Sequence, residues 1–219
     1  KGLVKREVIR VVTTGTITSS QALDETKNNY LMAVVYTGNN YGIATVDITT
    51  GDFFVTEVTS ERALLDEINK FTPSELVCNE ALFMSGLDMD ELKERYHFAV
   101  TALENRFFSD DDCRKILKEH FHVMSLEGLG LGDYENGMIA SGAVLQYLYE
   151  TQKYDLSHLT KITPYTTGQF MMIDTSTRRN LELVETLREK QKRGSLLWVL
   201  DKTKTAMGAR LLRSFIEQP

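Results

Sequence analysis

Three short apolar runs separated by two tight turns restrict the possible folds of this chain more than any other feature of its sequence. The first run, residues 30–36, is almost continuously apolar, which is typical of a strand buried on both faces. A turn at 38–40 separates it from a second run at 41–48, and a turn at 49–52 leads into a third at 53–58. Because turns this short join antiparallel neighbours, we expect a three-stranded meander.

Helices and short strands alternate after the meander. Ser60 is a suitable N-cap, and Pro73 ends the helix that Ser60 begins. Small residues fill 137–143, so a helix there can approach a neighbouring layer closely. We predict an extended segment over 7–12, a loop over 13–27, helices over 60–71, 90–95, 109–121 and 133–153, and strands over 75–78 and 97–102. This order is typical of an α/β RNase H-like fold, with a mixed sheet and flanking helices.

The last quarter of the chain reads as helical. Residues 155–168 are polar and include Pro164, so we place a domain boundary there, between an α/β domain over 1–155 and a helical segment over 156–219. Within that segment we expect an extended stretch over 170–173. Ser195 and Thr205 are suitable N-caps for two short helices. The apolar stripes of these helices comprise Leu196, Leu197, Val199 and Leu200 in the first, and Met207, Leu211, Leu212, Phe215 and Ile216 in the second.

Charge is distributed unevenly along the 219 residues. The net charge is −6, but residues 174–219 carry ten lysines and arginines against six acids, or +4, so the remainder carries −10. An acidic surface disfavours duplex DNA and is compatible with a solubility role or with protein docking. No apolar run is long enough to span a bilayer. Two isolated cysteines indicate a reducing compartment, and the start at Lys1 suggests an excised fragment.

Catalysis by metal-bound carboxylates is the main enzymatic alternative. RNase H-like nucleases hold two metal ions with three or four carboxylates, the first of them on the first strand. Here that strand carries no acid. Asp47 on the second strand and Glu80 after the fourth could complete a metal-binding cluster only if the strands paired in another register. Asp47 and Asp52 are better interpreted as supports of a strand end and a turn.

A phosphate-binding loop is weakly suggested by Gly128, Gly130 and Gly132. Their spacing does not match a dinucleotide fingerprint, and no clear strand precedes them, so a flexible linker is the better interpretation. The sequence contains no Gly-x-x-x-x-Gly-Lys-Ser/Thr loop for ATP.

Metal binding is also weakly suggested, by His120 and His122. Neither cysteine has finger-like spacing from the pair, so a solvated helix end is the preferred interpretation. For Cys78 and Cys113 no paired-cysteine motif exists, and burial on an apolar strand accounts for Cys78.

Basic residues of the helical segment could contact a phosphate backbone. The run Arg188, Lys190, Lys192 and Arg193 is better interpreted as the solvated face of a helix whose apolar side is formed by Leu181, Val184 and Leu187. Trp198 is expected in the core.

Two long segments carry a family resemblance. Residues 193–219 and 172–183 resemble the start of the core, or lever, domain of the MutS mismatch-repair family. Residues 6–16, 28–31 and 42–52 resemble the connector domain of that family. The resemblance departs at Thr14, where the family usually has proline, and at Phe215, where tryptophan is common; both are structural positions.

The resemblance implies a connector domain over 1–155 and the beginning of the core domain over 156–219. It places Arg178 and Arg179 in the core domain, away from the mismatch-reading element, and so implies that they serve packing and inter-domain salt bridges. Whole MutS proteins read mismatched DNA, hydrolyse ATP with Mg²⁺, form homodimers and recruit MutL. This chain lacks the mismatch-reading, clamp and ATPase domains, so its implied role is to transmit conformational change and to dock MutL, without catalytic, cofactor or metal residues of its own.

The implied location is the bacterial cytoplasm, at the nucleoid during repair, with no membrane contact. A metal-dependent nuclease is the alternative function. In the family, the core helices pack against segments that return later in the chain. We therefore expect the apolar faces of the last two helices to leave this tail mobile or paired with another copy.

Overall fold

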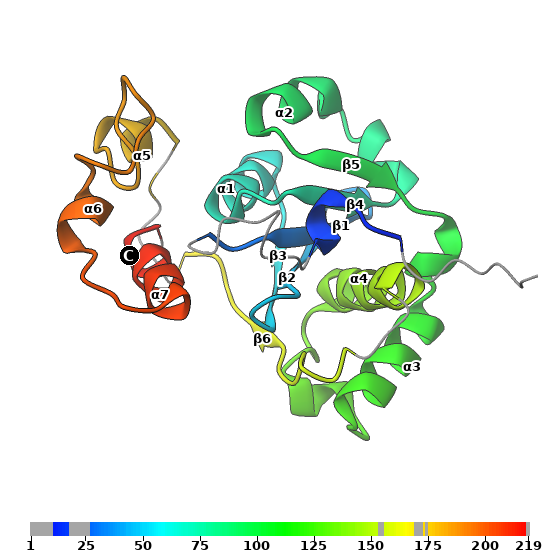
Figure 1. Ribbon diagram of the computed structural model, residues 1–219. Coiled ribbons are helices and arrows are strands. Elements are labelled where there is room, and N and C mark those ends of the chain that lie inside the picture. The colour runs from blue at the N-terminus through cyan, green and yellow to red at the C-terminus, as the bar shows by residue number, and fades with distance from the viewer. Residues whose placement is uncertain (1–10, 18–26, 153–155, 169–172, 174, 218–219) are drawn as a thin grey trace, which may run out of the picture.

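A six-stranded mixed sheet forms the centre of the computed structural model (Figure 1). The structure describes residues 11–17, 27–152, 156–168, 173 and 175–217. The strand order is β5-β4-β1-β2-β3-β6. The strands are β1 Tyr30–Tyr36, β2 Tyr41–Asp47, β3 Asp52–Val58, β4 Glu75–Cys78, β5 Ala99–Ala102 and β6 Thr163–Pro164.

The predicted meander is confirmed. β1 pairs antiparallel with β2 from Tyr30 opposite Asp47 to Tyr36 opposite Tyr41, and β2 pairs antiparallel with β3. The turns between them use Gly38 and Gly51 at φ values of 85° and 81°, a region that glycine enters without steric cost. All seven residues of β2 are buried, because the strand lies between two others and is covered on both faces.

Parallel pairing extends the sheet on both sides of the meander. β4 pairs parallel with β1 and β5 parallel with β4, as the predicted helix-strand alternation requires. β6 pairs parallel with β3. The segment that we predicted as a polar boundary, 155–168, therefore contributes a strand to the sheet. A two-residue strand at an edge has no periodic pattern by which the sequence could reveal it.

Helices cover both faces of the sheet (Figure 1). The helices α1 Glu61–Phe71 and α2 Met89–Tyr96 lie on one face, and α3 Asp110–Phe121 and α4 Glu135–Gln152 lie on the other. Alternate residues of β1 enter the two layers: Met32 packs with α1 and α2, whereas Leu31 packs with α3 and α4. The prediction of a strand buried on both faces is therefore confirmed.

Side-chain caps define the helix starts that the sequence predicted. The hydroxyl of Ser60 accepts from the backbone N–H of Ala63, and that of Ser109 from Asp112. α1 ends at Phe71, just before Thr72, whose backbone is in the left-handed conformation, and Pro73.

The extended segment predicted over 7–12 is described only in part, because residues 7–10 lie outside the described residues. Val11 donates its N–H to the carbonyl of Thr151.

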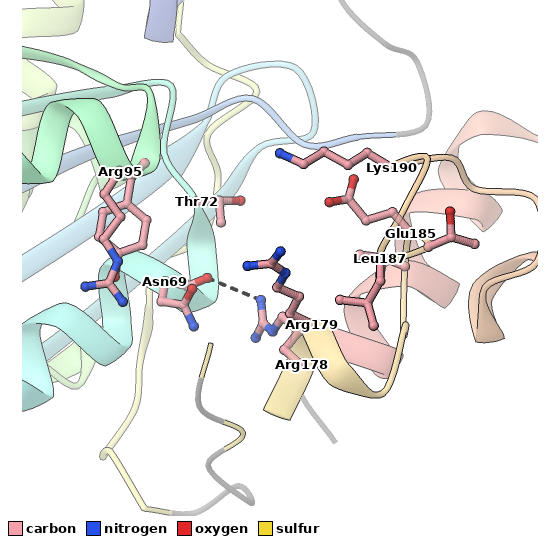
Figure 2. A pocket seen from close by; sticks show the side chains of 11 residues that line it. Asn69, Thr72, Arg95, Arg178, Arg179, Glu185, Leu187 and Lys190 are labelled. Carbon is pink, nitrogen blue, oxygen red and sulfur yellow. Dashed lines mark hydrogen bonds between the residues drawn. The ribbon is translucent and has the colours of Figure 1, made fainter. Parts of the chain in front are cut away.

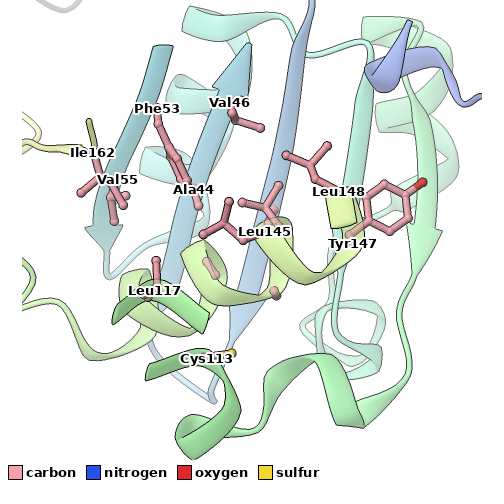
Figure 3. Packing of buried hydrophobic residues seen from close by; sticks show 14 of the residues in the cluster. Ala44, Val46, Phe53, Val55, Cys113, Leu117, Leu145, Tyr147, Leu148 and Ile162 are labelled. Atoms are coloured by element: carbon pink, nitrogen blue, oxygen red, sulfur yellow. The ribbon is translucent and has the colours of Figure 1, made fainter. Parts of the chain in front are cut away.

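Small residues allow α4 to lie directly on the sheet and on α3 (Figure 3). A Cβ added to Gly42 of β2 would lie 2.1 Å from the carbonyl carbon of Asn136. A Cβ on Gly142 would lie 2.3 Å from Cβ of Cys113. The predicted close approach of 137–143 is confirmed, and the contact extends to Asn136.

The C-terminal segment is less helical than predicted. It contains α5 Thr175–Asn180, α6 Leu196–Leu200 and α7 Ala206–Glu217, and residues 181–194 form turns instead of the expected helix. Glu182 and Lys190 have φ values of 48° and 47°, which interrupt any helix there. A short helix needs a packed face to be stable, and Leu181 and Leu187 remain exposed.

The two final helices begin at the predicted caps. Ser195 Oγ accepts from the N–H of Trp198 at 3.2 Å, and Thr205 Oγ1 accepts from the N–H of Gly208 at 3.1 Å. Their apolar stripes are largely exposed, at 55% for Leu211 and 64% for Phe215. Trp198 is 48% exposed, so our assignment of this residue to the core is wrong: only Leu197 of its helix turns inward. That the tail is mobile or self-associates stays a prediction.

Candidate functional site

The carboxylates considered for metal catalysis lie at opposite ends of the sheet. Asp47 pairs with Tyr30 at the beginning of β1, whereas Glu80 follows Cys78, which pairs with Val34 near the end of β1. Four residues of β1 separate Tyr30 from Val34, so a strand rise of about 3.3 Å per residue places these two levels about 13 Å apart. No group of three or more His, Cys, Asp or Glu suited to a metal occurs among the described residues.

Asp47 and Asp52 serve the strand end and the turn, as predicted. The buried carboxylate of Asp47 accepts from the N–H of Asn29 at 3.0 Å and from the N–H and hydroxyl of Thr49 at 2.8 and 2.7 Å. Asp52 accepts from the hydroxyl of Thr50 at 2.7 Å. These bonds use the carboxylates to hold the backbone of the turn.

The glycine-rich stretch connects two helices and has no phosphate-loop geometry. Gly128 lies within a 3-10 helix, Leu126–Leu129, and Gly130 caps it at a φ of 74°. Pro164 is close to Gly130, 3.2 Å from where a Cβ would lie. No strand leads into this connection, which agrees with the predicted linker.

His120 has a structural role that the sequence did not reveal. Its Nδ1 is 2.7 Å from the hydroxyl of Tyr149, and its Nε2 is 2.8 Å from the carbonyl of Leu159. Both ring nitrogens therefore join α3 to α4 and to the segment before β6, so the expected solvated end is wrong for His120. His122 is exposed at the helix C-cap.

Both cysteines are buried and chemically quiet. Desolvation raises the pKa of Cys78 and of Cys113 to about 12, so both thiols stay neutral near pH 7. The predicted burial of Cys78 is confirmed.

The joint between the sheet and the C-terminal helices is the most elaborate polar arrangement in the described part of the chain, and Arg178 lies at its centre (Figure 2). Its guanidinium donates to the carbonyl of Asn69 at 3.2 Å and to the carbonyl of Glu217 at 2.9 Å. These carbonyls belong to the last turns of α1 and α7, where the helix dipole is negative. One cation thus holds two helix ends together.

Burial lowers the pKa of Arg178, and the charge of Glu217 partly opposes that effect. We expected Arg178 to form inter-domain salt bridges. Among the described residues, its hydrogen bonds go to backbone carbonyls instead, and the role in packing between the two parts is confirmed. A hydrogen bond between residues 109 apart cannot be read from sequence.

Two further contacts extend the joint. Arg210 of α7 donates to the hydroxyl of Thr49 at 2.9 Å, beyond the end of β2. The pKa of Tyr30 in β1 is raised, first by burial and then by the charges of Asp52, Asp47 and Glu217. Because Glu217 ends α7, its effect on Tyr30 indicates that this end of the helix lies close to β1. α7 therefore contacts the α/β domain through Arg210, and its C-terminal end lies near β1.

A buried polar cluster lies next to the joint. Glu67 of α1 accepts a hydrogen bond from the hydroxyl of Tyr165 and pairs with Lys70 at 3.5 Å. The ammonium of Lys70 lies 4.0 Å from the centre of the Tyr165 ring. Tyr165 directly follows β6, so this cluster connects the sixth strand to α1, and no motif in the sequence indicated it.

The basic run 188–193 is solvent-exposed, as predicted, but it lies on turns and not on a helix. Lys192 pairs with Asp201 at 2.5 Å. Arg179 is exposed beside Arg178 and faces a cavity (Figure 2).

Comparison with known proteins assigns both parts of the chain. The family described as MutS domain II matches residues 29–160, and the family described as MutS domain III matches residues 176–219. The DNA mismatch repair protein MutS of Lachnoclostridium phytofermentans is 64% identical over 219 residues, and that of Ruminiclostridium cellulolyticum is 50% identical over 222 residues. Each match covers the whole chain and 24% or 25% of the relative.

The chain thus spans about a quarter of the length of the curated relatives it matches. No helix in the described part of the chain has the length and apolar character needed to cross a membrane.

Proposed function

Because the chain belongs to the MutS family, we propose that it acts in DNA mismatch repair as a coupling piece of a larger mismatch-recognition ATPase. In this proposal residues 1–155 are the connector domain and residues 156–219 are the first part of the core domain. The piece transmits conformational change between mismatch-reading and ATPase domains, docks MutL, and catalyses no reaction itself.

An RNase H-like fold is our assignment for the connector. It is supported by the order β3-β2-β1-β4-β5, with an antiparallel meander followed by two parallel strands. The metal-dependent nuclease, our alternative, is disfavoured by the separation of Asp47 from Glu80 along the sheet.

ATP binding belongs to other parts of the whole protein in this proposal. The glycine-rich stretch 128–132 does not fit the nucleotide, because Gly130 ends a 3-10 helix and Gly132 precedes α4 without a strand-loop-helix cradle.

The proposed partners are MutL through the connector, mismatched duplex DNA through other domains, and a second copy in a homodimer. The acidic N-terminal part supports a protein partner over direct DNA binding, because phosphate repels a negative surface. The DNA-repair names of the bacterial relatives support a cytoplasmic location at the nucleoid.

The Arg178 joint is the observation that carries the transmission role. It connects a helix of the connector to the last helix of the core segment through two backbone carbonyls. A joint held at helix ends moves the helices as rigid bodies, so displacement of one part is passed to the other.

The test is an Arg178→Gln substitution in a whole MutS protein that contains this segment. Glutamine keeps a donor but loses the guanidinium fork, so we expect mismatch-stimulated ATPase activity to fall by about twofold to thirtyfold while basal activity is unchanged. Arg188→Gln, on an exposed turn, is the matched control. Unchanged stimulation in the Arg178 variant would overturn the transmission role.

A further inference from the structure

A cavity of about 390 Å³ lies between the α/β domain and the C-terminal segment (Figure 2). One wall comes from the ends of α1 and α2, with Asn69, Thr72 and Arg95. The other wall comes from α5 and the turns after it, with Arg179 and Lys190. Its volume falls in the range of ligand pockets, about 300–1,000 Å³.

The lining of this cavity has an unusual charge. Arg95, Arg178, Arg179 and Lys190 line it, and Glu185 is the single carboxylate among its described lining residues. The chain as a whole has more acids than bases, with a net charge of −6. Gathering like charges around a cavity costs free energy because they repel one another. An anion placed inside the cavity would be attracted by all of them and would offset that repulsion.

Most of these cations are available to a ligand. Arg179 and Lys190 have no side-chain hydrogen bond or ion pair with the described residues, and Arg95 contacts only the ring of Tyr96, at 5.4 Å. Figure 2 shows the side chains of Arg179 and Lys190 extending toward the wall that carries Thr72. Arg178 already donates to the carbonyls of the two helix ends, so it contributes positive charge to the cavity wall rather than a free donor.

The positive environment continues beyond this cavity. A second cavity of about 230 Å³ shares Glu185 and Lys190 with the first and adds Lys192 and Arg213. The pKa of Lys70 nearby is lowered, first by burial and also by the charge of Arg178, which outweigh the stabilising effect of Glu67. Cations therefore continue along the joint. Within the described part of the chain, Lys70, Lys192 and Arg213 are each paired with a carboxylate, whereas Arg179 and Lys190 of the first cavity are not.

We propose that this cavity binds a phosphate-bearing anion between Arg179 and Lys190 on one side and Arg95 on the other. Guanidinium forks match phosphate oxygens in pairs, which favours phosphate over a single carboxylate. A bound anion contacts both walls, so it braces the two parts of the chain against each other. This inference does not depend on the proposed transmission role.

The phosphate could belong to a free polyphosphate or to a nucleic-acid backbone, and two probes distinguish these sources. Calorimetric titration of the chain at low ionic strength would use inorganic pyrophosphate and, separately, a short single-stranded oligothymidylate. Citrate serves as the carboxylate comparison. We expect saturable binding of pyrophosphate, weaker binding of citrate, and reduced hydrogen exchange in α5 and at the end of α1 when the site is filled.

Arg179→Gln should weaken binding of the preferred phosphate probe at least about tenfold, because it removes a charge-assisted pair. Arg188→Gln has the same charge change outside the cavity lining and should change affinity by less than about twofold. Tighter oligothymidylate binding, also lost in Arg179→Gln, would identify a nucleic-acid backbone. No binding of either phosphate probe, equal affinity for citrate, or equal losses in the two variants would overturn the proposal.

Discussion

Replacing Gly42 by alanine should destabilise the α/β domain severely. The new Cβ would lie 2.1 Å from the carbonyl carbon of Asn136 and 2.2 Å from its oxygen, where ordinary contacts begin near 3.4 Å. The obstacle is helix backbone, so no side-chain rotation relieves it. Strand β2 and helix α4 would have to separate by more than about 1 Å, opening gaps between the helix and the sheet.

We expect Gly42→Ala to lower the free energy of unfolding by at least about 3 kcal/mol, at the upper end of overpacking effects in cores. That loss corresponds to a fall of roughly 6–12 °C in Tm for a chain of this size. Urea unfolding followed by far-UV circular dichroism measures the change, because the sheet and its helices give most of the signal.

Gly128→Ala is the matched control, since no atom lies within 4 Å of its added Cβ. Alanine there should be neutral or stabilising by up to about 1 kcal/mol, because it restricts the unfolded chain. If the free energy of unfolding of Gly42→Ala lies within about 0.5 kcal/mol of the wild-type value, the close approach of α4 to β2 is refuted.

Two further predictions concern the groups considered for chemistry. Asp47→Ala should cost about 2–3 kcal/mol of stability, because the buried N–H of Asn29 and the half-buried N–H of Thr49 lose their acceptor. Cleavage of DNA by the wild type with Mg²⁺ or Mn²⁺, abolished by this substitution, would contradict a structural role. Cys78 and Cys113, with pKa values raised to about 12, should resist an aromatic disulfide reagent at pH 8 until urea unfolds the chain. Their contribution to stability is complete below the unfolded pKa, about 8.5, and is lost as pH rises toward 12, so fast labelling of the native chain at pH 8 would contradict their burial.

The sequence identified most elements of the α/β domain because their signals are local. The cap at Ser60, the left-handed turn glycine Gly51 and the apolar run of β1 each act through neighbouring residues. Strand β6 was missed because only its pairing with β3, more than one hundred residues earlier, makes it a strand.

The C-terminal segment shows the opposite case. Helical periodicity over 181–187 predicted a helix, but periodicity describes a face and cannot say whether anything packs against it. Leu181 is 57% exposed, and the segment adopts turns. The joint could not be predicted from the sequence either. The partners of Arg178 are backbone carbonyls, which every residue carries, so no residue type marks them in the sequence.

The most direct test of the account is a calorimetric titration of this chain with the cognate MutL, with intact MutS, ATP and mismatched DNA as the positive control. We expect saturable binding by the chain alone, without cleavage of DNA or hydrolysis of ATP. Absence of heat with the chain, against a working control, would contradict the proposal that the connector is sufficient to dock MutL.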